Sequence, residues 1–188
     1  MNTNSMGAAG IRTRGPWSPV AEVMGVAGSH GDPDVVRPPT VWSRAVEELT
    51  EAGTYWLGTV TAQGRPHVVP VLGVVVDGHV HFCASRGSRK TRHVATSRWC
   101  SITTSAATMD LVVEGLATPV DDGSEVDEVA RRYRDKYGWD PEVLDALLWA
   151  EGAPTAGPPP YHVSRVLPHK VLGFPTDDAS VVPTRWRF

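Results

Sequence analysis

Alternation of apolar and polar residues predicts that the middle of this chain folds as short β-strands. Between Tyr55 and Ser85, segments rich in Val, Thr and aromatic residues are separated by Gln63-Gly64 and Asp77-Gly78. Such dipeptides are typical of two-residue hairpin turns, because glycine adopts positive φ values at little steric cost. The pattern therefore predicts a three-stranded β-meander in this region.

Further extended segments are predicted after this meander. Trp99–Ser105 and Asp110–Val120 are rich in β-branched residues, and Tyr161–Leu167 and Lys170–Phe174 look like two strands separated by Pro168. This gives six or seven strands joined mainly by hairpins. Such an order favours an antiparallel barrel or another α+β fold over a parallel sheet.

Apolar residues that recur at helical spacing predict helices around these strands. The predicted helices cover residues 41–52 with Thr40 as the N-cap, residues 88–97, residues 124–137, and residues 140–148 opened by Asp140-Pro141. No Gly-x-Gly-x-x-Gly sequence follows a predicted strand and no Walker A sequence occurs. The sequence therefore argues against Rossmann and P-loop nucleotide sites.

The length of 188 residues and the hydrophobic content of 41% are enough for one domain with a substantial core. Residues 1–38 contain many Gly, Pro and Ser residues and show no sustained period of 2 or 3.6. Because such a segment buries little apolar surface, we expect a flexible N-terminal tail at 1–38 followed by a single domain over 39–188.

A net charge of -3 and a pI near 6.1 give no global positive field, so nucleic acid is not an expected partner. Cys83 and Cys100 form no close pair and no signal peptide is apparent, which favours reduced thiols and a cytoplasmic location. No apolar run approaches the roughly 20 residues that a membrane-spanning helix needs, so no membrane partner is expected.

A local basic segment contrasts with this acidic background. Ser85-Arg86-Gly87-Ser88-Arg89-Lys90 places three cations and a capping serine at the start of a predicted helix. A helix N-terminus offers N–H groups without intrahelical partners and a partial positive charge, so the segment is a candidate anion site for a phosphate group. The alternative is a capped helix with a solvated basic face.

Several short sequences, in this order, resemble the pyridoxamine 5'-phosphate oxidase-like split-barrel superfamily. They are Gly64-Arg65-Pro66-His67-Val68-Val69-Pro70-Val71, Asp77-Gly78, Phe82, Ser88-Arg89-Lys90-Thr91-Arg92 and Val113-Glu114-Gly115-Leu116-Ala117. The resemblance extends from about Thr54 to Phe174. It implies a mainly β (α+β) fold, a six-stranded antiparallel split β-barrel with flanking helices. It also implies a homodimer that binds FMN or the deazaflavin F420 between its subunits.

The resemblance further implies which residues hold the cofactor. Those expected at its phosphate are Ser85, Ser88, Arg89 and Lys90, and those whose backbone would follow its ring are Val69, Pro70 and Val71. Val69 stands where the oxidase that names the superfamily carries a phosphate-binding arginine. This departure argues against pyridoxamine phosphate oxidation and favours the broader flavin and F420 oxidoreductase groups.

The C-terminal segment Thr184-Arg185-Trp186-Arg187-Phe188 alternates aromatic and cationic residues, so in a strand Arg185 and Arg187 share one face. Two arginines on one face suit an anionic substrate. Similar endings close some members of the superfamily, which places Trp186 over the cofactor or at the dimer seam. An edge strand with a core tryptophan is the alternative.

His79, His81 and Cys83 share one face of a predicted strand, a spacing that can chelate a metal ion. Further ligands are not evident, and polar residues on the solvent face of a hairpin are the alternative. Cys83 also lies next to the basic segment, so it is a candidate for a redox-sensitive thiol of lowered pKa.

Other polar residues are expected to be structural. Glu114 lies within an apolar strand and is expected to form an ion pair, since an unpaired buried carboxylate is costly. His67 and His162 are candidate proton donors with structural roles as the alternative, and no Ser/His/Asp triad is apparent. The leading functional hypothesis is a cofactor-dependent oxidoreductase that transfers hydride to or from a small molecule. The alternative is a flavin, F420 or haem carrier or sensor without turnover.

Overall fold

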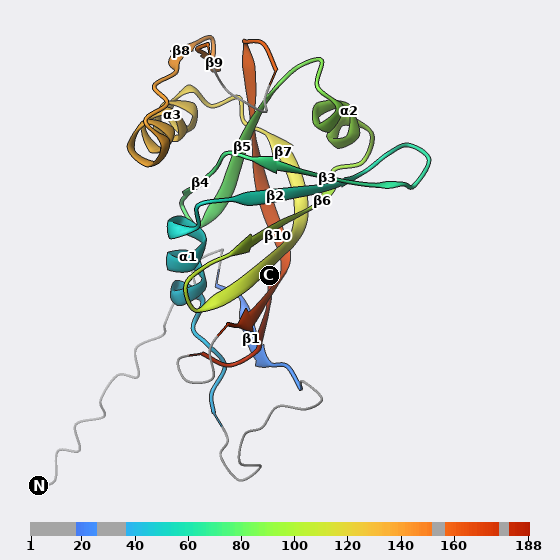
Figure 1. The fold of residues 1–188 in the computed structure, drawn as a ribbon, viewed down its shortest axis with the longest axis vertical. Helices are drawn as coiled ribbons and strands as arrows, with labels where there is room; N and C mark the ends of the chain where they lie inside the picture. Colours follow the sequence, from blue (N-terminus) through green and yellow to red (C-terminus); the bar gives the residue numbers. More distant parts are fainter. Residues whose placement is uncertain (1–17, 26–36, 152–156, 177–180) are drawn as a thin grey trace, which may run out of the picture.

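The structure, a computed structural model, describes residues 18–25, 37–151, 157–176 and 181–188 of the chain. These residues form one antiparallel sheet flanked by three helices (Figure 1). The strands are β1 (Val20–Val23), β2 (Tyr55–Val60), β3 (Pro66–Val71), β4 (Gly73–Val76), β5 (His79–Ser85), β6 (Trp99–Ser105), β7 (Met109–Pro119), β8 (Glu142–Leu144), β9 (Leu147–Trp149), β10 (Tyr161–Pro175) and β11 (Thr184–Arg187). The helices are α1 (Trp42–Glu51), α2 (Arg89–Thr96) and α3 (Gly123–Tyr137).

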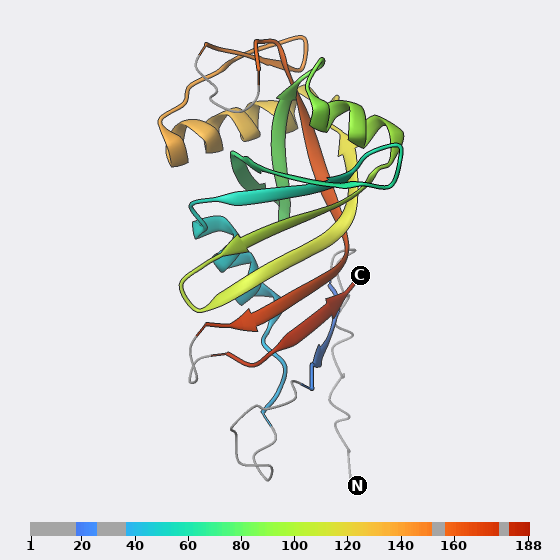
Figure 2. The same ribbon diagram turned by 45° about the vertical axis from the view of Figure 1, so that its right-hand side comes forward.

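Strand β10 organises the sheet. The main strand order is β1-β11-β10-β7-β6-β2-β3, while β5 pairs with the first half of β10 and carries β4 on its other edge. Strand β10 therefore belongs to both arms of a strongly bent sheet (Figure 2). The predicted mainly β, antiparallel split-barrel class is confirmed, and short strands extend the sheet beyond the six that were expected.

The predicted three-stranded meander is wrong. Strand β3 pairs with β2, and β4 pairs with β5, so the chain leaves one hairpin and enters another near Leu72. Asp77 and Gly78 have φ values of 49° and 76°, as the predicted two-residue turn requires. In the hairpin between β2 and β3, only Gly64 has a positive φ, at 77°. The backbone N–H of Thr61 donates to the Arg65 carbonyl, so this turn is longer than two residues.

The two strands predicted around Pro168 are one continuous strand. The pairing of β10 with β7 shifts register between Pro168 and Lys170, so a bulge at His169 accommodates the proline. Gly115 lies opposite this bulge, where a Cβ atom would overlap the carbonyl oxygen of Leu167. The glycine thus permits the close backbone approach.

The helix predicted over residues 140–148 is also wrong. This segment forms the β8–β9 hairpin, in which Asp145 and Ala146 have φ values of 54° and 57°. Leu148 of this hairpin is buried and pairs with Tyr161 of β10. Tertiary pairing therefore overrides the helical spacing of the apolar residues.

Two helix starts differ from prediction. Helix α1 begins after Val41, and Thr40 does not cap it. Instead the backbone N–H of Thr40 donates to Thr184 Oγ1 at 3.0 Å, which ties the start of α1 to β11. Helix α3 is capped by Asp122, whose carboxylate accepts from the N–H groups of Ser124 at 2.8 Å and Glu125 at 3.1 Å.

Part of the predicted tail is ordered within the fold. Val20–Val23 forms β1, which pairs with β11, so the expectation of flexibility is wrong for this segment. Glu22 of β1 forms ion pairs with Arg185 and Arg187 of β11, and these pairs fix the strand to the sheet. The rest of the prediction, for residues 1–17 and 26–36, lies outside the described residues.

The core has two parts. The larger part lies inside the barrel under α1 and includes Tyr55, Ile102 and Trp186. The smaller part lies under α3 and includes Tyr133 and Tyr161. Helices α2 and α3 sit at one end of the sheet and β1 and β11 toward the other (Figure 2). Among the described helices, none has the length and apolar character to cross a membrane.

Candidate functional site

A cavity of about 650 Å³ lies at the N-terminus of α2. It is lined by His67, Val69, Ser85, Arg86, Gly87, Ser88, Arg89, Lys90, Gly157, Pro158, Pro159 and Pro160. These residues come from β3, the end of β5, the start of α2 and the turn before β10. The structure therefore brings together Ser85, Ser88, Arg89, Lys90 and Val69, which were predicted to share a cofactor site. We call it the first cavity.

The start of α2 is held by a small set of hydrogen bonds. Ser88 is the N-cap, and its Oγ accepts from the backbone N–H of Thr91 at 3.2 Å. The Ser85 carbonyl accepts from Ser88 N at 3.1 Å and from Thr91 Oγ1 at 2.9 Å. These bonds fix the loop between β5 and α2, so the first-turn backbone faces the cavity in a defined conformation.

The lining of the first cavity is cationic. Arg86 and Arg89 are exposed, while Lys90 is only 5% exposed, and no lining residue is acidic. Burial lowers the pKa of Lys90, because the charged ammonium loses contact with water. Three cations beside a helix N-terminus give the site a positive potential that a phosphate would offset.

The three residues expected to follow the cofactor ring lie in different surroundings. Val69 lines the first cavity, whereas Pro70 is exposed and Val71 is 5% exposed and packs in the core. Among the described strands β3 pairs only with β2, so its other edge leaves backbone groups available beside the cavity. Pro70 contributes no N–H group to that edge.

The C-terminal residues do not reach the first cavity. Trp186 is fully buried in the barrel core, where its Nε1 donates to the Thr40 carbonyl at 3.0 Å. Arg185 and Arg187 both contact Glu22, at 2.6 and 3.0 Å. The core tryptophan of the alternative is therefore observed, but β11 is not an edge strand. It lies between β1 and β10, toward the other end of the sheet from α2.

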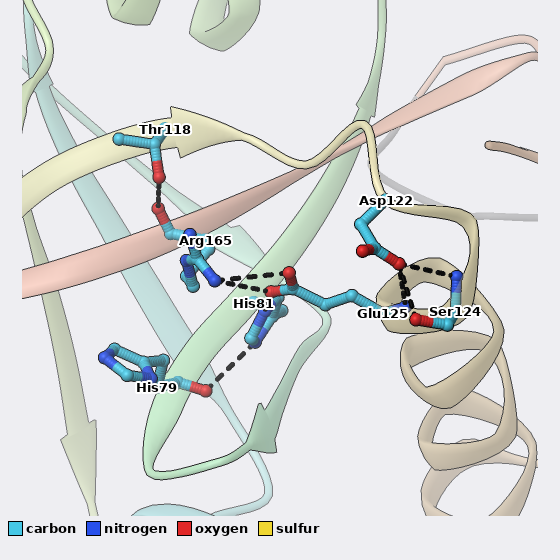
Figure 3. A network of polar contacts seen from close by, with 7 residues as sticks. All are labelled: His79, His81, Thr118, Asp122, Ser124, Glu125 and Arg165. Carbon is cyan, nitrogen blue, oxygen red and sulfur yellow. Dashed lines mark hydrogen bonds and ion pairs between the residues drawn. The ribbon is translucent and has the colours of Figure 1, made fainter.

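His79 and His81 belong to a buried polar network (Figure 3). His81 Nε2 lies 2.8 Å from Glu125 Oε1, and His81 Nδ1 lies 3.0 Å from the His79 carbonyl. Arg165 of β10 contacts both carboxylate oxygens of Glu125 at 3.1 and 3.2 Å. Glu125 therefore joins α3 to two strands, and no cluster of three metal-ligating side chains occurs in the described part of the chain.

The burial of this part of β5 changes two interpretations of the sequence. His79, His81 and Cys83 are all buried, so they do not occupy the solvent face of a hairpin. Burial raises the pKa of the Cys83 thiol to about 11, so the expectation of a reactive, low-pKa thiol is wrong. The partners Glu125 and Arg165 were missed in the sequence, since each is distant from the histidines along the chain.

Protein stability is expected to fall as pH decreases below about 6.5. Burial is the largest influence on both His79 and His81 and lowers the pKa of each from 6.5. The unfolded chain therefore binds protons first, and stability is lost between pH 6.5 and the lower native pKa values. Urea unfolding at about pH 7.5 and about pH 5.5 measures this loss, expected to be on the order of 1 kcal/mol.

The variant His81→Gln is the comparison for this pH effect. Its amide can still donate to Glu125 but does not titrate, so the loss between the two pH values is expected to be smaller than in the wild type. Equal losses in the two proteins would show that His81 does not cause the dependence.

Other predicted polar residues have clear positions. Glu114 pairs with Lys170 at 2.8 Å, so the predicted structural ion pair is confirmed. His67 lies in the first cavity, with its ring 5.0 Å from that of His93. His93, which the sequence did not single out, is held by Thr59 Oγ1 at 3.0 Å. His162 lines a different cavity, which lies between α2 and the strands β5, β7 and β10.

The fold is that of the split-barrel proteins, and in this chain it carries a cationic pocket at a helix N-terminus. The family model described as Pyridoxamine 5'-phosphate oxidase matches residues 42–173, which is more than half of the sequence. The protein belongs to this family. No protein with a curated description matches the sequence.

Solved structures share the fold at low sequence identity. General Stress Protein 26 from Bacillus anthracis is 15% identical with a TM-score of 0.56, over 78% of this chain and 98% of that one. The conserved hypothetical protein Rv2991 from Mycobacterium tuberculosis is 13% identical with a TM-score of 0.57, over 78% and 90% of the two chains. A heme binding protein from Mycobacterium smegmatis is 17% identical with a TM-score of 0.56, over 74% and 55%. These similarities show the fold alone.

Proposed function

We propose that the protein is an oxidoreductase that binds FMN or F420 in the first cavity and transfers hydride to or from a small molecule. One observation carries the proposal. In a family that commonly binds flavins, the first cavity places Ser88, Arg89 and Lys90 around a helix N-terminus with no acidic residue in the lining. This donor set has the charge and geometry that a cofactor phosphate requires.

The residues present fit a phosphate better than a neutral ligand. Lys90 lines the cavity and is almost fully buried, and an ammonium group at a bound anion forms a charge-assisted hydrogen bond. Arg89 is exposed at the first turn and can reach a bound anion without leaving the helix. The cavity of about 650 Å³ also extends along Val69 to the Pro158–Pro160 turn, which leaves space for a ring system beyond the phosphate.

The chain would bind, orient and shield the cofactor. Bound FMN or F420 supplies the hydride chemistry, and the protein needs few catalytic groups of its own. Arg89 and Lys90 would anchor the phosphate, while Val69 and the proline turn would exclude water from one side of the ring. His67 is the lining group best suited to hold or move a proton at its imidazole nitrogens.

We also propose that the protein is a homodimer with the cofactor at the subunit interface. The outer face of β2, β3 and β6 exposes large apolar side chains, with Trp56 at 47%, Val68 at 59% and Trp99 at 52% exposure. Exposed apolar groups gathered on one face favour a protein partner. The first cavity borders this arm of the sheet through β3, so a second subunit could cover its open side.

Binding without turnover is the second candidate function. It is favoured by the lining itself, in which the described residues supply several anion-binding groups but one imidazole, that of His67, for proton transfer. Steady-state oxidation of reduced FMN or F420 by an added quinone separates the two candidates. A carrier or sensor would bind the cofactor and leave the oxidation rate unchanged.

FMN is expected to bind at least about 100-fold more tightly than riboflavin, which lacks the phosphate. Each charge-assisted hydrogen bond to a phosphate contributes about 1.5–3 kcal/mol, and the first cavity offers two or more such donors. Flavin fluorescence during titration of the purified protein measures both affinities, and F420 is titrated in parallel. Equal affinity for FMN and riboflavin, together with no binding of F420, would contradict the proposed phosphate site.

A further inference from the structure

A second cavity of about 520 Å³ lies on another side of α2, between this helix and strands β5, β7 and β10. It is lined by Phe82, Ala84, Arg86, Thr91, Val94, Ala95, Arg98, Ala117, Pro119, His162, Val163 and Ser164. Of these residues only Arg86 also lines the first cavity. The second cavity is therefore a separate space.

The floor of the second cavity is apolar and belongs to the core. Phe82 and Ala117 are at most 2% exposed and pack in the barrel core. In the sheet, Ser164 pairs with both Phe82 and Pro119, so three neighbouring strands present one continuous surface there. This floor can bury the apolar body of a small ligand.

Helix α2 forms the opposite wall with short side chains. Thr91, Val94 and Ala95 lie at helical spacing on the face toward the sheet. Val94 packs partly against the barrel core, while Ala95 is exposed and too small to fill the gap beside it. The space arises because a helix of eight residues closes this end of the barrel with small side chains.

The rim of the second cavity is cationic. Arg86, Arg98 and His162 are exposed around it, and none of its lining residues is acidic. Arg98 is positioned by its backbone, since its carbonyl accepts from Ala117 N at 2.8 Å. Within the described residues, neither Arg86 nor Arg98 forms an ion pair.

We propose that the second cavity binds a small carboxylic acid with an apolar, ring-sized body. The body would lie against Val94, Ala95 and Pro119, above the buried floor. The carboxylate would accept hydrogen bonds from Arg98 at the rim, where a guanidinium can bind it in a bidentate manner. Inorganic phosphate fits this cavity less well, because it has no apolar group to cover the floor. This site stands independently of the proposed redox function.

The test uses 2-naphthoate as the probe and the full-length protein. Calorimetric titration is expected to show binding of 2-naphthoate, with about tenfold or greater loss of affinity in Arg98→Gln. The uncharged analogue 2-naphthamide is expected to bind more weakly than 2-naphthoate to the wild type. Arg131→Gln, at an exposed arginine of α3, is the matched control and is expected to bind 2-naphthoate like the wild type.

A second variant tests the apolar part of the site. Ala95→Phe adds a ring from an exposed position of α2, so it is expected to block 2-naphthoate without disturbing the core. FMN affinity is the internal reference, because Arg98 and Ala95 do not line the first cavity. Loss of 2-naphthoate binding with unchanged FMN binding supports the proposal. If FMN does not bind the wild type, loss of 2-naphthoate binding in Arg98→Gln and Ala95→Phe but not in Arg131→Gln supports it without that reference.

Three results would overturn the proposal. They are no detectable binding of 2-naphthoate, equal affinity in the wild type and Arg98→Gln, and displacement of 2-naphthoate by FMN in direct competition. The last result would place the probe in the first cavity.

Discussion

The double variant Arg89→Gln/Lys90→Met is expected to bind FMN or F420 about 10² to 10⁴-fold more weakly than the wild type. Each side chain can give a phosphate one charge-assisted hydrogen bond of about 1.5–3 kcal/mol, and the two together account for this range. Fluorescence titration of both proteins with the cofactor that binds the wild type measures the change.

The choice of substitutions follows from the burial of each side chain. Lys90 is only 5% exposed, so methionine keeps an apolar stem of similar length where alanine would leave a void. Arg89 is exposed, and glutamine preserves its helical propensity and polarity. The expected result is therefore a loss of affinity in a folded protein, which circular dichroism confirms before titration.

A matched control removes two cations elsewhere. Arg131→Gln/Arg132→Gln changes the net charge equally on α3, where both side chains pair with Glu128 at the surface. If the control weakens the cofactor as much as the cavity variant does, the effect comes from the overall charge. Wild-type affinity in the Arg89→Gln/Lys90→Met variant would exclude these residues as the phosphate site.

Trp186→Ala is expected to lower the free energy of unfolding by about 3–5 kcal/mol. Trp186 is fully buried, packs edge-on against Trp42 with ring centroids 5.7 Å apart, and donates its indole N–H to the Thr40 carbonyl. Alanine leaves a cavity in the barrel core and an unsatisfied carbonyl at the start of α1. Urea unfolding followed by far-ultraviolet circular dichroism measures the loss.

Trp99→Ala is the control for this prediction. Trp99 is 52% exposed, and its main ring contact is His169, so its removal is expected to change stability by about 0.5 kcal/mol. Cofactor affinity also separates the two roles considered for Trp186. A folded Trp186→Ala protein that retains wild-type stability but loses the cofactor would show that the tryptophan acts at the site.

The sequence is most informative where structure is local. Trp99–Ser105 forms a strand with the predicted bounds, because β-branched residues and alternation suffice to specify it. The turn at Asp77-Gly78 and the capping role of Ser88 are likewise properties of a few neighbouring residues. The pattern of such pieces indicated an antiparallel barrel or α+β fold, and the resemblance to a known family implied the split-barrel class.

Errors arise where distant pairing decides the conformation. Residues 142–149 carry apolar side chains at helical spacing, yet Leu148 pairs with Tyr161 and the segment becomes a hairpin. Val20–Val23 has no strong strand pattern and is extended because β11 offers a free edge. Neither partner can be read from the segment itself.

The candidate site also contains parts that are visible in the local sequence and parts that depend on distant strand pairing. Ser85 to Lys90 is contiguous, so its anion chemistry is visible along the chain. The Gly157–Pro160 wall and the Glu125–Arg165 pair depend on the path of β10. Trp186 carried an apparent functional signal, but the pairing of β11 buries it in the core.

The long strand β10 has a consequence for synthesis in the cell. Tyr161–Pro175 pairs with β5, β7 and β11, and each partner strand is incomplete without it. A chain emerging from the ribosome therefore exposes the edges of β5 and β7 until residues 161–175 have left the exit tunnel. Barrel closure must follow the emergence of β10, so the unpaired strands are most exposed to aggregation before this strand is available.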